Sequence, residues 1–176
     1  MYGGRGMLGK QVVFRKFKDF TVAAKPPVRV APSTDTQKLQ QSKFLEACAY
    51  AKLAKKDATL WEKYEAMGKA KKQPARNFAI KDYLCPPKLS VINTSAYKGA
   101  IGSKISIVTF DDFEIRSVAV KITKADDTLV ESGNAIEEGG EWVYTTTIAN
   151  AAIEGCKVIV EARDLPGNIT TKEVIL

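Results

Sequence analysis

The chain has 176 residues, of which 45% are hydrophobic and 27% charged, and it contains three cysteines and no histidine. This length suits one large domain or two small ones, and the composition is that of an ordinary globular protein. The lack of histidine excludes Ser-His-Asp and Cys-His nucleophiles, the commonest transition-metal ligand and the usual general base near neutral pH.

Charge is distributed unevenly along the chain. Residues 1–84 have a net charge of +11 and residues 85–176 a net charge of −4, against +7 for the whole chain. Such asymmetry favours two regions with different roles. We predict a basic module over 1–84 and a second domain over 85–176. The basic module can face nucleic acid, an anionic surface or an acidic protein.

The cysteines and the N-terminus indicate the compartment. Cys48, Cys85 and Cys156 are widely spaced and form no CxxC pair, so we expect reduced thiols and neither a zinc site nor a disulfide. No apolar run is long enough to span a membrane. The start MYGGRGMLGKQ lacks the apolar region of a secretory signal. We therefore predict a cytoplasmic location, or export without a secretory signal as part of a particle.

The first thirty residues predict a flexible start and a β-hairpin. Glycines at positions 3, 4, 6 and 9 favour flexibility, and QVVFRKF and FTVAAK indicate two short strands around Lys18-Asp19. An isolated hairpin is marginal in water, so it needs the rest of the chain or another subunit to lie on. Pro26, Pro27 and Pro32 then predict an extended linker.

Three helices follow. The run from Thr34 to Lys56 has no Gly or Pro, and its apolar face is expected at Phe44, Cys48 and Ala51, with Leu45 and Ala49 beside them. Small residues would let another helix approach closely: Ala47, Ala51 and Ala54. Asp57 is the predicted cap of a second helix with apolar Leu60, Trp61, Tyr64 and Met67. A third short helix is expected over Ala75–Leu84, with Phe78, Ile80 and Tyr83 as anchors.

From Lys88 the periodicity becomes that of strands. Seven are expected, at about 88–94, 103–110, 113–123, 128–132, 141–148, 156–163 and 168–175. Alternation is clear in two places: Trp142, Tyr144, Thr146 and Ile148 are expected to share one face of a strand, and Cys156, Val158, Val160 and Ala162 one face of another. The pattern changes phase near Ser117, which predicts a β-bulge. The predicted class is α+β: an N-terminal hairpin and helical module followed by an all-β, immunoglobulin-like sandwich of about seven strands.

The end of the chain carries a resemblance to a known class of domains. The run CKVIVEARDLPGNITTKEVIL resembles the last two strands of bacterial immunoglobulin-like and fibronectin-like domains, through Ala162, Asp164, Gly167 and Asn168. The buried cysteine pair of antibody domains is missing. The resemblance therefore implies the sandwich architecture and not the antibody lineage.

The front half is similar to a group of small Bacteroidetes proteins that has no established activity. The shared pattern is a glycine-rich start, an aromatic-basic hairpin, a Pro-rich turn and a helix in which Thr34, Gln37, Gln40 and, one residue late, Phe44 carry the repeat. This resemblance suggests that the chain is associated with phage-like or phage-tail-like particles.

The predicted partner-binding surface is the basic and aromatic cluster of the hairpin. Its residues are Phe14, Arg15, Lys16, Phe17, Lys18 and Lys25, with Phe20 nearby. Cations with exposed aromatic rings suit single-stranded nucleic acid, and they equally suit an acidic groove on a protein. The alternative is that Phe14 and Phe17 belong to a core.

Two other patterns are candidate ligand sites. The N-terminal glycines follow no strand and lack the GK[ST] ending of a phosphate loop. Acidic residues in predicted turns could bind calcium at one end of the sandwich: Asp111, Asp112, Asp126, Asp127 and Asp164. Aspartate is also simply a good turn former, and we favour that interpretation.

Together these observations predict a non-catalytic structural or interaction protein, with no catalytic, cofactor or metal residues. We expect a component or packaged cargo of a phage-like or contractile injection particle, whose hairpin docks on a protein partner or on particle subunits. The alternative is a nucleic-acid-binding protein that uses the basic half. A hydrolase delivered as cargo would need a carboxylate or lysine centre, and the sequence assembles none.

Overall fold

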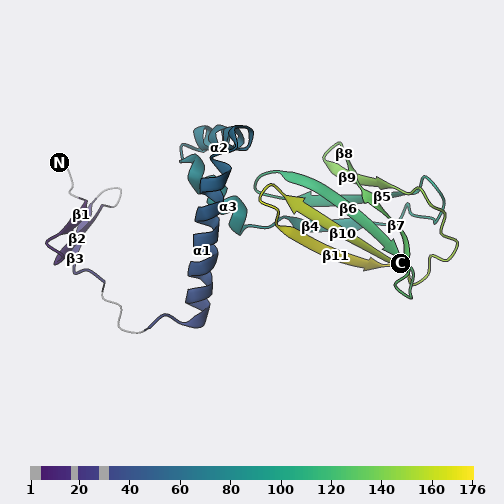
Figure 1. The fold of residues 1–176 in the computed structure, drawn as a ribbon, viewed down its shortest axis with the longest axis horizontal. Helices are drawn as coiled ribbons and strands as arrows, with labels where there is room; N and C mark the ends of the chain where they lie inside the picture. The colour runs from purple at the N-terminus through teal and green to yellow at the C-terminus, as the bar shows by residue number, and fades with distance from the viewer. Residues whose placement is uncertain (1–4, 17–19, 28–31) are drawn as a thin grey trace. The chain divides into compact units, whose positions relative to one another are not determined.

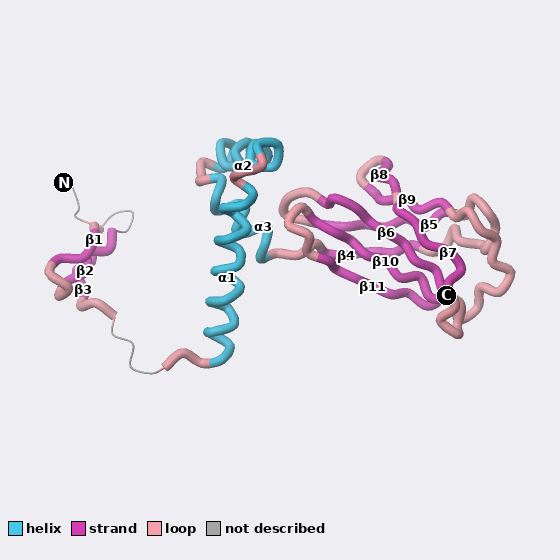
Figure 2. Tube along the Cα trace, viewed as in Figure 1, coloured by secondary structure: helices cyan, strands magenta, loops and turns pink. Residues whose placement is uncertain are grey.

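The computed structural model describes residues 5–16, 20–27 and 32–176, and the chain divides into two compact units, Met1–Gln40 and Gln41–Leu176. Among the described residues there are three helices and eleven strands in three sheets, so the fold is mixed α and β and mostly β. Figures 1 and 2 show that the helices and the strands occupy separate segments of the chain. The domain boundary predicted at 84/85 stays a prediction.

The first unit contains a small antiparallel sheet in the order β1-β2-β3, with strands Gly6–Leu8, Val12–Lys16 and Thr21–Ala24. The predicted pairing of β2 with β3 is confirmed, and its turn, residues 17–19, lies outside the described residues. Strand β1 replaces part of the expected flexible start. Gly9 and Lys10 both have positive φ, 56° and 58°, and such a two-residue turn matches the twist of paired strands.

Helices α1, α2 and α3 span Asp35–Ala54, Ala58–Lys71 and Ala75–Leu84, as the sequence predicts. The cap of α2 is confirmed, because Asp57 Oδ1 accepts a hydrogen bond from the Leu60 amide at 3.1 Å. Lys72 ends α2 in the left-handed conformation, with φ at 53°, and Pro74 then opens α3. Local capping and chain breakers therefore set the helix boundaries.

The helical core depends on small side chains. Its buried residues are Ala47, Ala51, Ala54, Tyr64, Phe78, Ala79 and Ile80. The predicted apolar face of α1 is wrong at Phe44 and Leu45, which are 50% and 68% exposed, and at Ala49, which is also exposed. Burial on α1 begins only at Ala47, so Phe44 and Leu45 lie N-terminal to the stretch where α1 is packed.

The C-terminal strands form two four-stranded antiparallel sheets, β11-β10-β6-β7 and β4-β5-β9-β8. The predicted strands are found at the following bounds: β4 Lys88–Asn93, β5 Lys104–Phe110, β6 Ile115–Thr123, β7 Leu129–Asn134, β9 Glu141–Thr145, β10 Lys157–Asp164 and β11 Ile169–Ile175. A further short strand, β8 Ile136–Glu138, pairs with β9 and was not predicted.

One apolar core lies between the two sheets. Ile105, Ile107 and Tyr144 come from one sheet, and Val118, Val120, Ile122, Val158, Val160 and Ala162 come from the other. The shared face predicted for Cys156, Val158, Val160 and Ala162 is confirmed, and the structure shows that it is buried, whereas Ile148 lies beyond the end of β9 and is exposed. The predicted bulge near Ser117 is confirmed, because Arg163 pairs with Ser117 but Asp164 pairs with Ile115. Whether this arrangement is immunoglobulin-like stays a prediction at this point.

Candidate functional site

The predicted partner-binding residues lie mainly on β2. Arg15, Lys16 and Lys25 are exposed and Phe14 is half-buried, while Phe17 and Lys18 lie outside the described residues. Because successive side chains of a strand point to opposite faces, Phe14 and Lys16 share one face and Arg15 belongs to the other. The sheet therefore presents basic residues on both faces.

The five aspartates considered for calcium separate into two sets. Asp112 forms an ion pair with Lys81 at 2.7 Å, and Asp127 forms one with Lys157 at 2.6 Å. Asp126 accepts a hydrogen bond from the Thr128 amide at 3.0 Å and so stabilises a turn. Asp111 and Asp164, in contrast, come together with a third carboxylate.

That third carboxylate is Asp82, on α3, which the sequence analysis did not single out. One oxygen from each of Asp82, Asp111 and Asp164 lies within 4.8 Å of the other two. Asp82 and Asp164 are fully buried and Asp111 is half-buried. We call these three residues the carboxylate cluster. The sequence could have indicated the burial of Asp82, because helical spacing places it on the same face as Phe78 and Ala79, and that face is buried.

Two tyrosines position Asp82 from the helical side. The Tyr64 hydroxyl, on α2, donates a short hydrogen bond to Asp82 Oδ2. The hydroxyls of Tyr50, on α1, and Tyr64 are 2.9 Å apart. Because Tyr64 uses its only hydroxyl proton on Asp82, Tyr50 is the donor in the second bond. The chain of hydrogen bonds thus links all three helices and leaves Asp82 Oδ1 without a partner.

Asp164 is held by the turn that follows β10. Its Oδ1 accepts from the amides of Gly167 and Asn168, at 2.9 and 2.6 Å, and its Oδ2 accepts from Asn168 Nδ2 at 2.8 Å. Gly167 has φ of 93°, a conformation that favours glycine. The residues that carry the resemblance to bacterial immunoglobulin-like domains therefore build one wall of the carboxylate cluster.

Asn168 also connects this turn to α3. Its Nδ2 lies 3.3 Å from the Asp82 carbonyl and 3.2 Å from the Tyr83 carbonyl, in the last turn of the helix. Carbonyls at a helix C-terminus have no partner within the helix and need an outside donor. One amide group therefore serves both the helix end and the carboxylate of Asp164.

The third member, Asp111, directly follows β5. The backbone amides of Asp112 and Phe113 donate to its carboxylate, whereas its buried Oδ2 has no hydrogen-bond partner. Next to it lies a hollow of about 590 Å³, lined by Leu84, Cys85, Pro86, Pro87, Lys88, Phe110, Asp111 and Asp112. Of the three carboxylates, Asp111 is the one that borders this hollow.

Burial governs the electrostatics of the cluster. It raises the pKa of Asp82 from the ordinary 3.8 to about 7, and the nearby charge of Asp164 acts in the same direction. Burial likewise raises the pKa of Asp111 and of Asp164. In the part of the chain that the structure describes, none of the ion pairs includes a member of the cluster. The cluster therefore concentrates negative charge that no described lysine or arginine pairs with.

A pH dependence of stability follows from the raised pKa of Asp82. Between 3.8 and about 7 the folded chain binds more protons than the unfolded chain, so the free energy of unfolding falls as pH rises through this window. With EDTA present to keep metal ions off the carboxylates, the midpoint of thermal unfolding is expected to be higher at about pH 5 than at about pH 8. Asp82→Asn should shrink the difference. Asp126→Asn should preserve it, because the pKa of Asp126 is lowered and lies below the window. A midpoint that rises from pH 5 to pH 8 would contradict the assignment.

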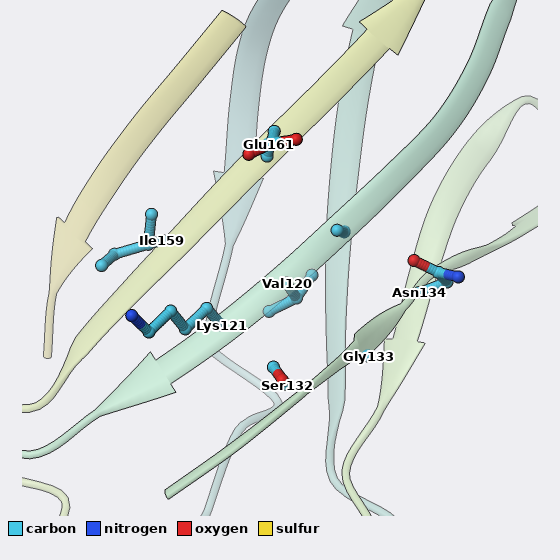
Figure 3. Close-up of a pocket in the computed structure, with 8 residues that line it drawn as sticks. Val120, Lys121, Ser132, Gly133, Asn134, Ile159 and Glu161 are labelled. Carbon is cyan, nitrogen blue, oxygen red and sulfur yellow. The ribbon is translucent and has the colours of Figure 1, made fainter. Parts of the chain in front are cut away.

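A second hollow, shown in Figure 3, offers much less chemistry. It measures about 250 Å³ and lies against β6, β7 and β10, with Lys121, Ser132, Asn134, Ile159 and Glu161 in its lining. Glu161 is engaged by Arg163 at 3.0 Å. The volume is below the range of typical ligand pockets, about 300–1,000 Å³. The carboxylate cluster is therefore the stronger candidate site.

Comparisons with known proteins supply no family for this chain: a scan against protein-family models, a search of curated proteins and a search of solved structures each returned no match. None of the described helices is both long enough and apolar enough to cross a membrane.

Proposed function

We propose that this protein is a non-catalytic structural or interaction protein that joins a larger assembly through its N-terminal sheet. The observation that carries the proposal is the exposure of that sheet. Its strands have three, five and four residues, and no described residue in them is buried. Met7 and Leu8 are 59% and 67% exposed. A sheet this small and this open gains little from folding alone, so a partner that covers it would stabilise it.

Charge argues for an acidic protein as that partner. Residues 1–40 contain eight Lys and Arg against two Asp. Among these, Arg15, Lys16 and Lys25 are exposed around β2 and β3. Strands β1 and β3 are the edges of the sheet, and an edge strand can pair with an extended segment of another chain. Strand addition by a segment with acidic flanks would satisfy both the open edge and the positive charge.

The two C-terminal sheets serve, in this proposal, as an immunoglobulin-like body. With the strands lettered A, B, C, C′, D, E, F and G in chain order, β4-β5-β9-β8 reads A-B-E-D and β11-β10-β6-β7 reads G-F-C-C′. This is the strand order of immunoglobulin sandwiches. The order supports the resemblance found at the end of the chain. The assembly itself we propose to be a phage-like or contractile injection particle, as the resemblance of the N-terminal half suggests.

The test is removal of the docking sheet. In cells that make the protein naturally, the full-length tagged chain should sediment with high-mass particles, and a chain lacking residues 1–30 should not. The truncated chain should keep the thermal midpoint of the second unit, since Gln41–Leu176 is a separate compact unit. Co-sedimentation of the truncated chain would overturn the proposal.

Charge reversal tests the acidic partner. Arg15→Glu, Lys16→Glu and Lys25→Glu together should remove the chain from the particle fraction. A matched control reverses three other exposed lysines, Lys98, Lys121 and Lys124, and should leave sedimentation unchanged. Tight binding of single-stranded DNA or RNA that weakens steeply with salt, and that the same triple change abolishes, would instead favour the nucleic-acid alternative.

A further inference from the structure

The carboxylate cluster has an unusual arrangement of hydrogen bonds. Hydrogen-bond donors hold each carboxylate: Tyr64 holds Asp82 Oδ2, the amides of the next turn hold Asp111, and Gly167 and Asn168 hold both oxygens of Asp164. Asp82 Oδ1 and Asp111 Oδ2 are buried and have no hydrogen-bond partner. Asp82 is also 0% exposed, so water does not solvate its free oxygen.

Without a positive charge nearby, this arrangement lowers the stability of the folded chain. A buried ionised carboxylate loses its hydration, and three carboxylates within 4.8 Å of one another repel. Two lysines near the cluster are engaged elsewhere, Lys81 with Asp112 and Lys63 with Glu114. The described ion pairs therefore bring no positive charge to the cluster, which is held by hydrogen-bond donors alone.

We propose that Asp82, Asp111 and Asp164 bind one divalent cation, Ca²⁺, at the junction of α3 with the two sheets. A hard cation with oxygen ligands fits a cluster of three carboxylates that form no ion pair with a described lysine or arginine. Asp82 Oδ1, Asp111 Oδ2 and a carboxylate oxygen of Asp164 supply protein ligands. Ca²⁺ takes six to eight oxygens, and the hollow beside Asp111 gives water access to the remaining positions.

We propose calcium and not magnesium because of the number of carboxylates that the protein supplies. Mg²⁺ keeps several of its waters and is usually bound through one or two carboxylates. Here three carboxylates converge, which is more than the one or two through which Mg²⁺ is usually bound. Bound Ca²⁺ would hold together α3, the segment after β5 and the end of β10, so it would fasten the helices to the sheets.

The experiment uses the full chain, freed of metal with EDTA and exchanged into chelator-free buffer. Titration calorimetry with CaCl₂ should show one site, and the thermal midpoint should rise by roughly 5–10 °C at a hundred times the dissociation constant. Tb³⁺ luminescence excited through tyrosine gives an independent signal, since Tyr64 contacts Asp82. All three signals should be lost in Asp111→Asn, whose half-exposed position tolerates the change.

Asp82→Asn should give the sharpest result. It removes a ligand and one buried charge, so it should raise the midpoint in EDTA near neutral pH and abolish the further rise with CaCl₂. Asp112→Asn is the matched control, because Asp112 is the neighbour of Asp111 and pairs with Lys81. It should bind Ca²⁺ as the unchanged chain does.

Four results would overturn the proposal. These are no binding of Ca²⁺, binding of Mg²⁺ without Ca²⁺, calcium binding unchanged in Asp111→Asn, and equal loss of binding in Asp112→Asn. The proposal does not depend on the docking role of the N-terminal sheet, so a chain lacking residues 1–30 should still bind Ca²⁺.

Discussion

Phe113→Ala is expected to lower the thermal midpoint of the second unit by roughly 5–15 °C. Phe113 lies between β5 and β6, yet its ring packs edge-on against two helical rings, Tyr64 and Phe78, with centroid distances of 6.0 Å to each. Truncation would open a cavity between helices and sheets. Truncating a buried phenylalanine to alanine costs about 3–5 kcal/mol, and because Phe113 is only partly buried we expect a loss of about 2–4 kcal/mol.

The same substitution should separate the unfolding of helices and sheets. In a Trp61→Phe background, where Trp142 is the remaining tryptophan, far-UV circular dichroism and tryptophan fluorescence should change together, because Phe113 joins the helical core to the strands. In Phe113→Ala the helical signal should be lost first. The control is Phe110→Ala, a neighbouring ring that is 60% exposed and should change the midpoint little. If both substitutions changed the thermal midpoint equally, Phe113 would not be what couples the helical core to the strands.

Asn168→Ala is expected to cost about 1–3 kcal/mol in the free energy of unfolding. The asparagine amide donates toward the Asp82 and Tyr83 carbonyls and to Asp164 Oδ2. Alanine would leave the end of α3 and a buried carboxylate without this donor. An unsatisfied buried acceptor costs more than the net worth of the hydrogen bond itself.

Urea unfolding measures this effect. Asn134→Ala is the matched control, because Asn134 lies on β7 and is exposed; it should change the free energy of unfolding by less than about 0.5 kcal/mol. If Asn168→Ala were equally mild, the connection between the turn and α3 would contribute little to stability. The variant should also weaken calcium binding, since Asp164 would lose a donor that orients it.

Local patterns in the sequence predicted most of the secondary structure. Asp57 and Pro74 mark the starts of α2 and α3 because capping and the missing proline amide act within one helical turn. The inward face of β10 follows from an alternation that a strand imposes by itself. The bulge near Ser117 was also predictable, since an extra residue shifts the phase of the apolar alternation along the strand. Strand β8 was missed because three exposed residues carry no such pattern.

The candidate site, in contrast, was decided by tertiary structure. Asp82, Asp111 and Asp164 come from a helix, a loop and a strand end, and no spacing in the sequence relates them. Asp111 and Asp112 are adjacent in the same turn, yet Asp111 belongs to the cluster and Asp112 pairs with Lys81. Phe44 and Leu45 likewise looked like core and are exposed, because burial on α1 begins only at Ala47. The sequence by itself determined which segments are helix or strand, since those choices depend on neighbours along the chain. Which charges end up buried together depends on contacts between distant segments, and only the packed structure specifies those.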